Sequence, residues 1–378
     1  MKDVMGIIYT DNYSLAMREL TTHRCIAALP VAGRYRMVDF FLSNFVNSGV
    51  RNVGIITQRN YRSLMDHLGG GKEWDLHTRN NGLFILPPFI NRDNAGEYEG
   101  MLDGLRANVD YLRHSKQEYV AIVGSRIIFN YDFTDFFRTH EETKADVTLL
   151  YTHIDNINTE YSHSSEQSRV FLDVDADGKV KDMEIDPNVP SFPNYAMNVV
   201  ILKRTLLIHL TDQAYARGYH DFYADLLRPY IAGSLLDVRG YEFKGYARRI
   251  ETISGYYNFS MDLLKSEVRE ELFNSNPVYT KVRDEAPARY LEGAKVSNSL
   301  IADGCVIEGT VENSILFRGV HIGRDTVVRN SVLMQDDDIL DSVELDSVIL
   351  DKDVTIRSHG RLIGQTHYPI VIGKNVTL

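Results

Sequence analysis

A short repeat in the last quarter of the chain limits its fold more than any other feature. Between Val296 and Ile363, aliphatic residues return every five or six positions, separated by Gly, Asp, Asn and Ser. The triplet Asn-Ser-aliphatic begins at positions 298, 313 and 330, and Asp-Ser-Val at 346 continues it. A period near six with small or polar corners is typical of stacked coils whose faces are short strands. We therefore predict a parallel β-helix at residues 293–378, because a sandwich would show wider spacing and two-residue alternation.

The chain before the repeat has a different pattern. From Val4 to about Ile253, short β-branched runs alternate with amphipathic stretches, which predicts a mostly parallel sheet covered by helices. The clearest strands are predicted at 53–57, 119–123 and 147–151, and the clearest helices at 39–48 and 100–114. Ligands of such sheets bind beyond the carboxyl ends of the strands, where the loops 11–16 and 124–130 are expected. We predict an α/β domain at 1–262 and a linker at 263–292.

Composition excludes several functional classes. The net charge of −11 leaves no basic surplus for nucleic acid or an anionic membrane. Cys25 and Cys305 are too far apart in the sequence to suggest a disulfide framework, and the histidines form no spaced ligand pair. No apolar run approaches the roughly 20 residues that span a bilayer, and no signal peptide is evident. We expect a cytoplasmic protein that binds neither nucleic acid nor membrane.

One long segment carries a family resemblance. The stretch AGRYRMVDFFLSNFVNSGVRNVGIITQRNYRSLMDHL, residues 32–68, resembles bacterial ADP-glucose pyrophosphorylase (glucose-1-phosphate adenylyltransferase). Residues 100–113 and 245–264 are similar to the same family. The resemblance implies a Rossmann-like nucleotidyltransferase domain followed by a left-handed parallel β-helix of hexapeptide repeats. It also implies a reaction in which glucose-1-phosphate attacks the α-phosphate of ATP with the help of Mg²⁺.

The residues that this chemistry needs are replaced at several positions. In the family, a Gly-Gly-x-Gly-x-Arg loop holds the triphosphate; here its glycines fall on Asp11, Asn12 and Ser14 and its arginine on Ala16. A carboxylate about 4 Å from a phosphate would repel it by roughly 4 kcal/mol at an effective dielectric of about 20. The other replaced positions are Ile26 for a phosphate-binding lysine, Ser125 and Arg249 for two magnesium-binding aspartates, and Asp186 for a sugar-phosphate lysine. Mg²⁺ would lack its expected ligands, unless Glu251 or Asp132 replaced them.

Other family positions are retained. Gln58 falls where the family contacts adenine, so Gln58 and Asp103 are candidates for residual nucleotide or sugar binding. We expect Asp39 and Asn44 to cap a helix and to bind buried backbone groups. His23 lies near the effector region of the family and is a candidate for sensing a phosphate.

Selective loss of the site residues within an intact scaffold suggests binding in place of catalysis. The chain resembles the GlgD type of non-catalytic, regulatory subunit, which implies a heterotetramer with catalytic subunits and no cofactor of its own. Self-association in isolation is a further possibility. Two alternatives stay open: an active nucleotidyltransferase with displaced catalytic groups, and a stand-alone sensor of a sugar phosphate or nucleotide.

Overall fold

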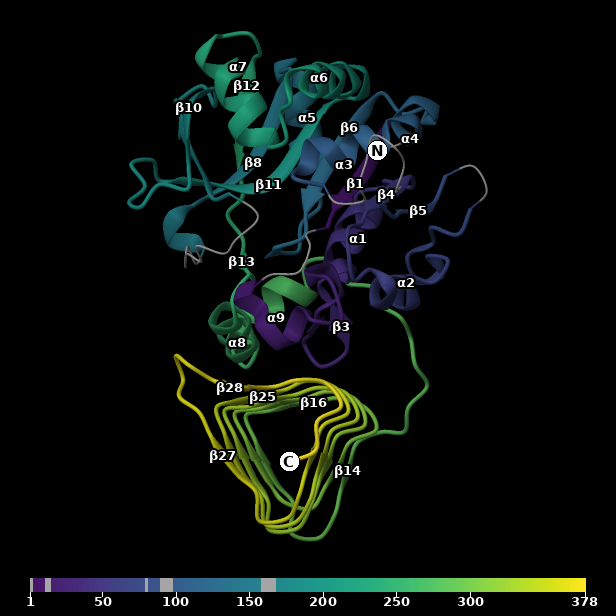
Figure 1. Ribbon diagram of the computed structural model, residues 1–378, viewed down its shortest axis with the longest axis vertical. Coiled ribbons are helices and arrows are strands. Elements are labelled where there is room, and N and C mark those ends of the chain that lie inside the picture. The colour runs from purple at the N-terminus through teal and green to yellow at the C-terminus, as the bar shows by residue number, and fades with distance from the viewer. Residues whose placement is uncertain (1–2, 11–14, 79–80, 89–97, 158–167) are drawn as a thin grey trace.

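The computed structural model describes residues 3–10, 15–78, 81–88, 98–157 and 168–378. It has an α/β domain stacked on a C-terminal β-helix (Figure 1). None of the helices in these ranges is long and apolar enough to cross a membrane.

The α/β domain is built on a mixed sheet, as predicted. Its main path has the order β10-β9-β11-β6-β1-β4-β5, and β8 joins β11 to β12. Strand β1 pairs in parallel with β4 and β6, whereas β11 is antiparallel to β6. The bounds are β1 Val4–Tyr9, β4 Val53–Ile56, β5 Leu83–Leu86, β6 Tyr119–Gly124, β8 Val147–His153, β9 Val170–Val174, β10 Val180–Ile185, β11 Asn194–Lys203 and β12 Val238–Glu242. The predicted strands at 53–57, 119–123 and 147–151 are therefore confirmed.

Helices and two small sheets surround this main sheet. The helices are α1 Met37–Asn47, α2 Arg62–Leu68, α3 Met101–Ala107, α4 Val109–His114, α5 Thr134–Thr143, α6 Arg204–Arg217, α7 Arg228–Ala232, α8 Ile253–Asp262 and α9 Ser266–Phe273, with short helical turns at Leu15–Thr21, Ile26–Ala28, Lys72–Trp74, Ile154–Asn156 and Phe222–Leu227. One small sheet pairs β2 (Pro30–Val31) with β3 (Tyr35–Arg36), and the other pairs β7 (Ile127–Ile128) with β13 (Arg248–Arg249).

The helix predicted at 100–114 is wrong in one respect, because it is broken into α3 and α4 at Asn108. The Asn108 amide donates a hydrogen bond to the Gly104 carbonyl at 2.8 Å. Asparagine side chains compete in this way with helical hydrogen bonding. The chain therefore turns at Asn108 before the second helix begins.

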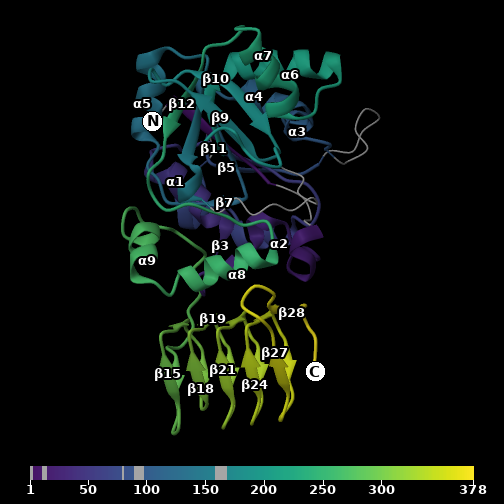
Figure 2. The ribbon, with the colours of Figure 1, turned by 90° about the vertical axis from the view of Figure 1, so that its left-hand side faces the viewer.

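The predicted left-handed parallel β-helix is confirmed. Three five-stranded parallel sheets form the sides of a triangle (Figure 1), and the coils stack along one axis (Figure 2). The strands of the three sides are β14 Arg289–Tyr290, β17 Val306–Ile307, β20 His321–Ile322, β23 Asp338–Ile339 and β26 Thr355–Ile356; β15 Lys295–Ser297, β18 Thr310–Glu312, β21 Val327–Arg329, β24 Glu344–Asp346 and β27 Arg361–Ile363; and β16 Leu300–Ile301, β19 Ile315–Leu316, β22 Val332–Leu333, β25 Val348–Leu350 and β28 Ile370–Ile372.

The Asn-Ser triplets form one corner of the triangle. Asn298, Asn313 and Asn330 have φ of 40°, 47° and 47°, a left-handed conformation that asparagine tolerates. Their side chains form a ladder in which Asn298 Nδ2 donates to Asn313 Oδ1 at 2.7 Å. The adjacent Ser314 hydroxyl accepts from the Ser331 backbone N–H of the next coil at 3.1 Å. The repeat therefore closes the turn and joins successive coils.

The two domains share one apolar core. Ile315, Val332 and Ile349 of the β-helix belong to the same buried cluster as the residues of α1 and α8. A buried ion pair also joins the domains: Arg24 Nη2 donates to Asp351 Oδ1 at 2.8 Å, and Arg24 Nη1 donates to Asp351 Oδ2 at 3.0 Å. Helix α9 packs on the α/β domain through Phe273, so residues 274–288 form the extended connection to β14.

Candidate functional site

The two positions expected to bind magnesium lie side by side. Ser125 directly follows β6, and Arg249 lies in β13, which pairs with β7 so that Arg249 faces Ile127. The Ile250 backbone N–H donates to the Arg126 carbonyl at 2.7 Å. Both expected positions are buried, with 0% of Ser125 and 2% of Arg249 exposed.

A buried cluster of charged side chains, Arg126, Arg249 and Glu251, surrounds these positions. Glu251 Oε2 lies 2.5 Å from Arg249 Nη2 and 3.4 Å from Arg126 Nη1. Arg249 Nη1 also donates to the Tyr195 hydroxyl at 2.7 Å. Two guanidinium groups thus share one carboxylate. Because like charges repel strongly in a buried site, these residues do not fit a divalent cation.

Glu251 and Asp132, the two alternative magnesium ligands considered from the sequence, both bind other groups of the protein. Glu251 is bound to the arginines, and Asp132 Oδ1 accepts from the Thr134 backbone N–H at 2.8 Å. Within the described residues, no group of three or more His, Cys, Asp or Glu side chains could hold a metal ion.

Asp186 occupies the position where the family has a lysine that binds the sugar phosphate, and its carboxylate is bound by Arg169. Asp186 Oδ1 accepts from the Arg169 backbone N–H at 2.8 Å, and the Arg169 guanidinium Nε lies 3.6 Å from the same oxygen. Arg169 Nη2 donates to the Pro187 carbonyl at 2.8 Å. This carboxylate therefore holds β10 to the start of β9 and offers no cation to a phosphate.

The retained residues Gln58 and Asp103 both bind groups of the protein. Gln58 is 5% exposed, and its Nε2 donates to the Tyr9 hydroxyl at 2.7 Å; its Oε1 has no hydrogen-bond partner among the described residues. Asp103 Oδ2 accepts from the Gly100 backbone N–H at 3.1 Å, which caps α3. Asp103 also accepts from His220 Nδ1 at 2.9 Å and raises the pKa of that imidazole.

The capping role expected for Asp39 is confirmed, whereas Asn44 lies within α1 and caps no helix but binds buried backbone groups, as also expected. Asp39 Oδ2 accepts from the Arg36 backbone N–H at 2.9 Å at the start of α1, and Asn44 Nδ2 donates to the Phe129 carbonyl at 3.1 Å. Ile26 is fully buried, Ala16 is half-buried, and His23 is exposed. The remaining predicted loop positions, Asp11, Asn12 and Ser14, lie outside the described residues.

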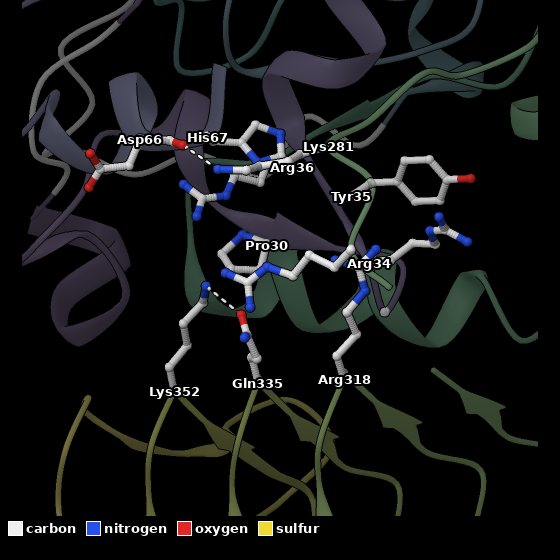
Figure 3. A pocket seen from close by; sticks show the side chains of 12 residues that line it. Pro30, Arg34, Tyr35, Arg36, Asp66, His67, Lys281, Arg318, Gln335 and Lys352 are labelled. Carbon is white, nitrogen blue, oxygen red and sulfur yellow. Dashed lines mark hydrogen bonds between the residues drawn. The ribbon is translucent and has the colours of Figure 1, made fainter. Parts of the chain in front are cut away.

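Sequence reasoning missed a cationic cavity between the domains, which we call the interdomain cavity. It encloses about 110 Å³ and is lined by Pro30, Gly33, Arg34, Tyr35, Arg36, Asp66, His67, Lys281, Arg283, Arg318, Gln335 and Lys352. Arg34 and Arg36 come from the β2–β3 hairpin, whereas Arg318, Gln335 and Lys352 point up from three successive coils (Figure 3). Arg318, Gln335 and Lys352 are spaced 17 residues apart in the sequence, and this spacing could have indicated that their side chains stack on successive coils.

The charges of the interdomain cavity are poorly neutralised. Six lysine and arginine side chains line it, and Asp66 is the one lining acid within the described ranges. Arg318 is only 7% exposed, and its Nε and Nη2 have no hydrogen-bond partner among the described residues. Burial and the nearby Arg34 lower the pKa of Arg318. Burial of unpartnered guanidinium nitrogens is costly, so the cavity favours an anion that would accept their hydrogen bonds.

Comparison with known proteins agrees with this architecture. The family model described as nucleotidyl transferase matches residues 16–266, and the model described as GlmU-like, C-terminal hexapeptide matches 286–368. These matches and the fold define a nucleotidyltransferase-type domain joined to a hexapeptide β-helix.

Individual relatives narrow the family further. The chain is 35% identical to the glycogen biosynthesis protein GlgD of Bacillus subtilis (strain 168) over 99% of this chain and 96% of that protein. It is 37% identical to GlgD of Geobacillus stearothermophilus over 86% and 82% of the two chains. It is 30% identical to a glucose-1-phosphate adenylyltransferase of Mycoplasma mobile over 87% and 85%. The chain belongs to the ADP-glucose pyrophosphorylase (glucose-1-phosphate adenylyltransferase) family, and within it to the GlgD type.

Proposed function

We propose that this chain is a regulatory, catalytically inactive subunit of glucose-1-phosphate adenylyltransferase in glycogen biosynthesis. The observation that carries the proposal is the buried cluster of Arg126, Arg249 and Glu251, which includes one position where the family resemblance implies a magnesium ligand, Arg249, and a direct neighbour of the other, Ser125. Phosphoryl chemistry of this kind depends on a cation that neutralises developing charge on the reacting phosphates. Here Glu251 already pairs with both arginines, and the part of the chain that the structure describes has no group of three or more His, Cys, Asp or Glu side chains that could hold a metal ion.

The interdomain cavity supports the regulatory part of the proposal. Its cations come from both domains, so a bound anion would add contacts between them. Lys352 directly follows Asp351, which binds Arg24 of the α/β domain. A ligand that binds one arrangement of the two domains more tightly shifts the population toward it. We therefore assign an anionic, phosphorylated effector to the interdomain cavity.

The first coil of the β-helix supports assembly with a partner subunit. Strands β14, β15 and β16 are the end strands of their three sheets, so one edge of each has no neighbouring strand among the described residues. Tyr290 and Val296 are exposed on this coil. Open strand edges favour pairing with another chain. We propose that this end contacts a catalytic subunit in a cytoplasmic heterotetramer, and that it can also contact a second copy in isolation.

The proposal is tested by adding the chain to the catalytic subunit of the same organism at a fixed concentration. We expect the two to co-purify, and we expect the partner's KM or its response to phosphorylated effectors to change. Arg318→Gln should weaken the effector response, whereas the matched control Arg324→Gln, on the exposed surface of the same domain, should not. Failure to bind the partner, or binding without any kinetic effect, would overturn the regulatory assignment.

A further inference from the structure

The position of Lys352 in the interdomain cavity allows an inference about how the cavity responds to pH. We propose that binding of an anion in the interdomain cavity is coupled to uptake of one proton by Lys352, so that the anion binds more tightly as the pH falls. The inference rests on the proposed function, because it concerns the effector cavity assigned there.

No carboxylate among the described residues forms an ion pair with the Lys352 ammonium group. Its Nζ lies 3.3 Å from the Gln335 carboxamide oxygen. The neighbouring carboxylate, Asp351, has both oxygens engaged by the guanidinium of Arg24. The ammonium group therefore gains only a neutral acceptor while it is partly buried.

The groups that face Lys352 from other elements are mainly permanent cations. Arg36 approaches from β3, Arg24 from the chain before the helical turn 26–28, and Arg283 from the extended connection. Burial has the largest effect, and these three guanidinium groups add to it, so the pKa of Lys352 falls to about 7; Asp351 opposes the shift. At neutral pH a substantial fraction of the side chain is therefore neutral.

Other charged groups also line the cavity. Asp66 and His67 line the cavity from α2, but His67 Nε2 lies 2.6 Å from Asp39 Oδ1 and is occupied by that contact. Lys281 Nζ donates to the Asp66 carbonyl at 2.7 Å, and Arg318 stays charged at all relevant pH values.

An anion in the interdomain cavity would shift the protonation equilibrium of Lys352 toward the charged ammonium form. It would offset the repulsion from the guanidinium groups and would accept a hydrogen bond from the ammonium, both of which favour the charged form. Above pH 7 the empty protein holds this proton only in part, whereas the complex holds it fully. Affinity should therefore fall as the pH rises, approaching tenfold per pH unit when one whole proton is taken up.

The test uses the full-length chain and inorganic sulfate, which remains a dianion between pH 6 and 9. Isothermal titration calorimetry at pH 8 in two buffers of different ionisation enthalpy measures the protons taken up on binding. We expect an uptake approaching one proton, and a sulfate dissociation constant that increases several-fold from pH 6.5 to 7.5 and about tenfold from 7.5 to 8.5.

Lys352→Arg keeps the cation at every pH, so its sulfate affinity should not change over this range. Lys281→Arg makes the same exchange at another lining lysine and should keep the wild-type pH dependence. If Lys352→Arg does not fold, Lys352→Gln serves instead and should bind weakly and without pH dependence. Sulfate binding that is independent of pH, or a slope that persists without Lys352, would overturn this inference while leaving the cavity intact as an effector site. An absence of sulfate binding at every pH would overturn the cavity assignment itself.

Discussion

The buried ion pair between Arg24 and Asp351 should make a large contribution to the docking of the two domains. The side chains are 4% and 1% exposed, and both carboxylate oxygens are engaged. Asp351→Asn keeps the shape and one acceptor but leaves the Arg24 charge buried without a counter-ion. Removing one partner of a buried pair costs about 3–5 kcal/mol, so we expect a loss of that size in the free energy of unfolding.

The assay is equilibrium unfolding in urea, followed by tyrosine fluorescence and by circular dichroism. Glu344→Gln is the matched control, because it removes the charge from an Arg–Glu pair with Nε–Oε2 at 2.7 Å whose side chains are 68% and 42% exposed. An exposed pair of this kind contributes about 0–1 kcal/mol. Equal losses in the two variants would refute the argument that burial makes the interdomain pair important.

Three further predictions concern single side chains. Burial raises the pKa of Asp337 well above its usual value, so this group lowers the free energy of unfolding as the pH rises from 4, by up to ~1.4 kcal/mol per pH unit. The Asp337→Asn variant should therefore lose less stability than the wild type between pH 5 and 8 in urea unfolding curves. Burial lowers the pKa of His140 to about 4, so stability should fall as the pH drops from about 6.5 toward 4, and His140→Gln should reduce that loss in acid unfolding curves. Tyr9→Phe removes the hydroxyl that accepts from the buried Gln58 amide, and should cost about 1–3 kcal/mol in the same urea assay.

Features that follow from local sequence could be predicted. The Asn-Ser triplets place left-handed corners and apolar strands at fixed intervals, so the β-helix follows from the repeat alone. The alternation of apolar strands and amphipathic helices likewise predicts the sheet of the α/β domain. The break at Asn108 was missed because the Asn108 side chain, not the hydrophobic pattern of 100–114, ends the first helix.

Only part of the candidate site could be predicted from the sequence. Ser125 and Arg249 were identified as replaced family positions, but the shared binding of two arginines by Glu251 depends on the pairing of β7 with β13. The interdomain cavity was missed entirely. Its cations come from a hairpin at 34–36, an extended segment at 281–283 and two coils of the β-helix, and these segments meet only when the domains dock.

The central claim is that this chain does not catalyse the reaction of its family. The most direct measurement is the rate of ADP-glucose formation by the purified chain alone with ATP, Mg²⁺ and glucose-1-phosphate. We predict no product above the enzyme-free control, because the two expected magnesium positions are a serine and an arginine, and the nearby Glu251 is paired with Arg249 and Arg126. Turnover in the ordinary enzymatic range of about 1–10³ per second would contradict the account.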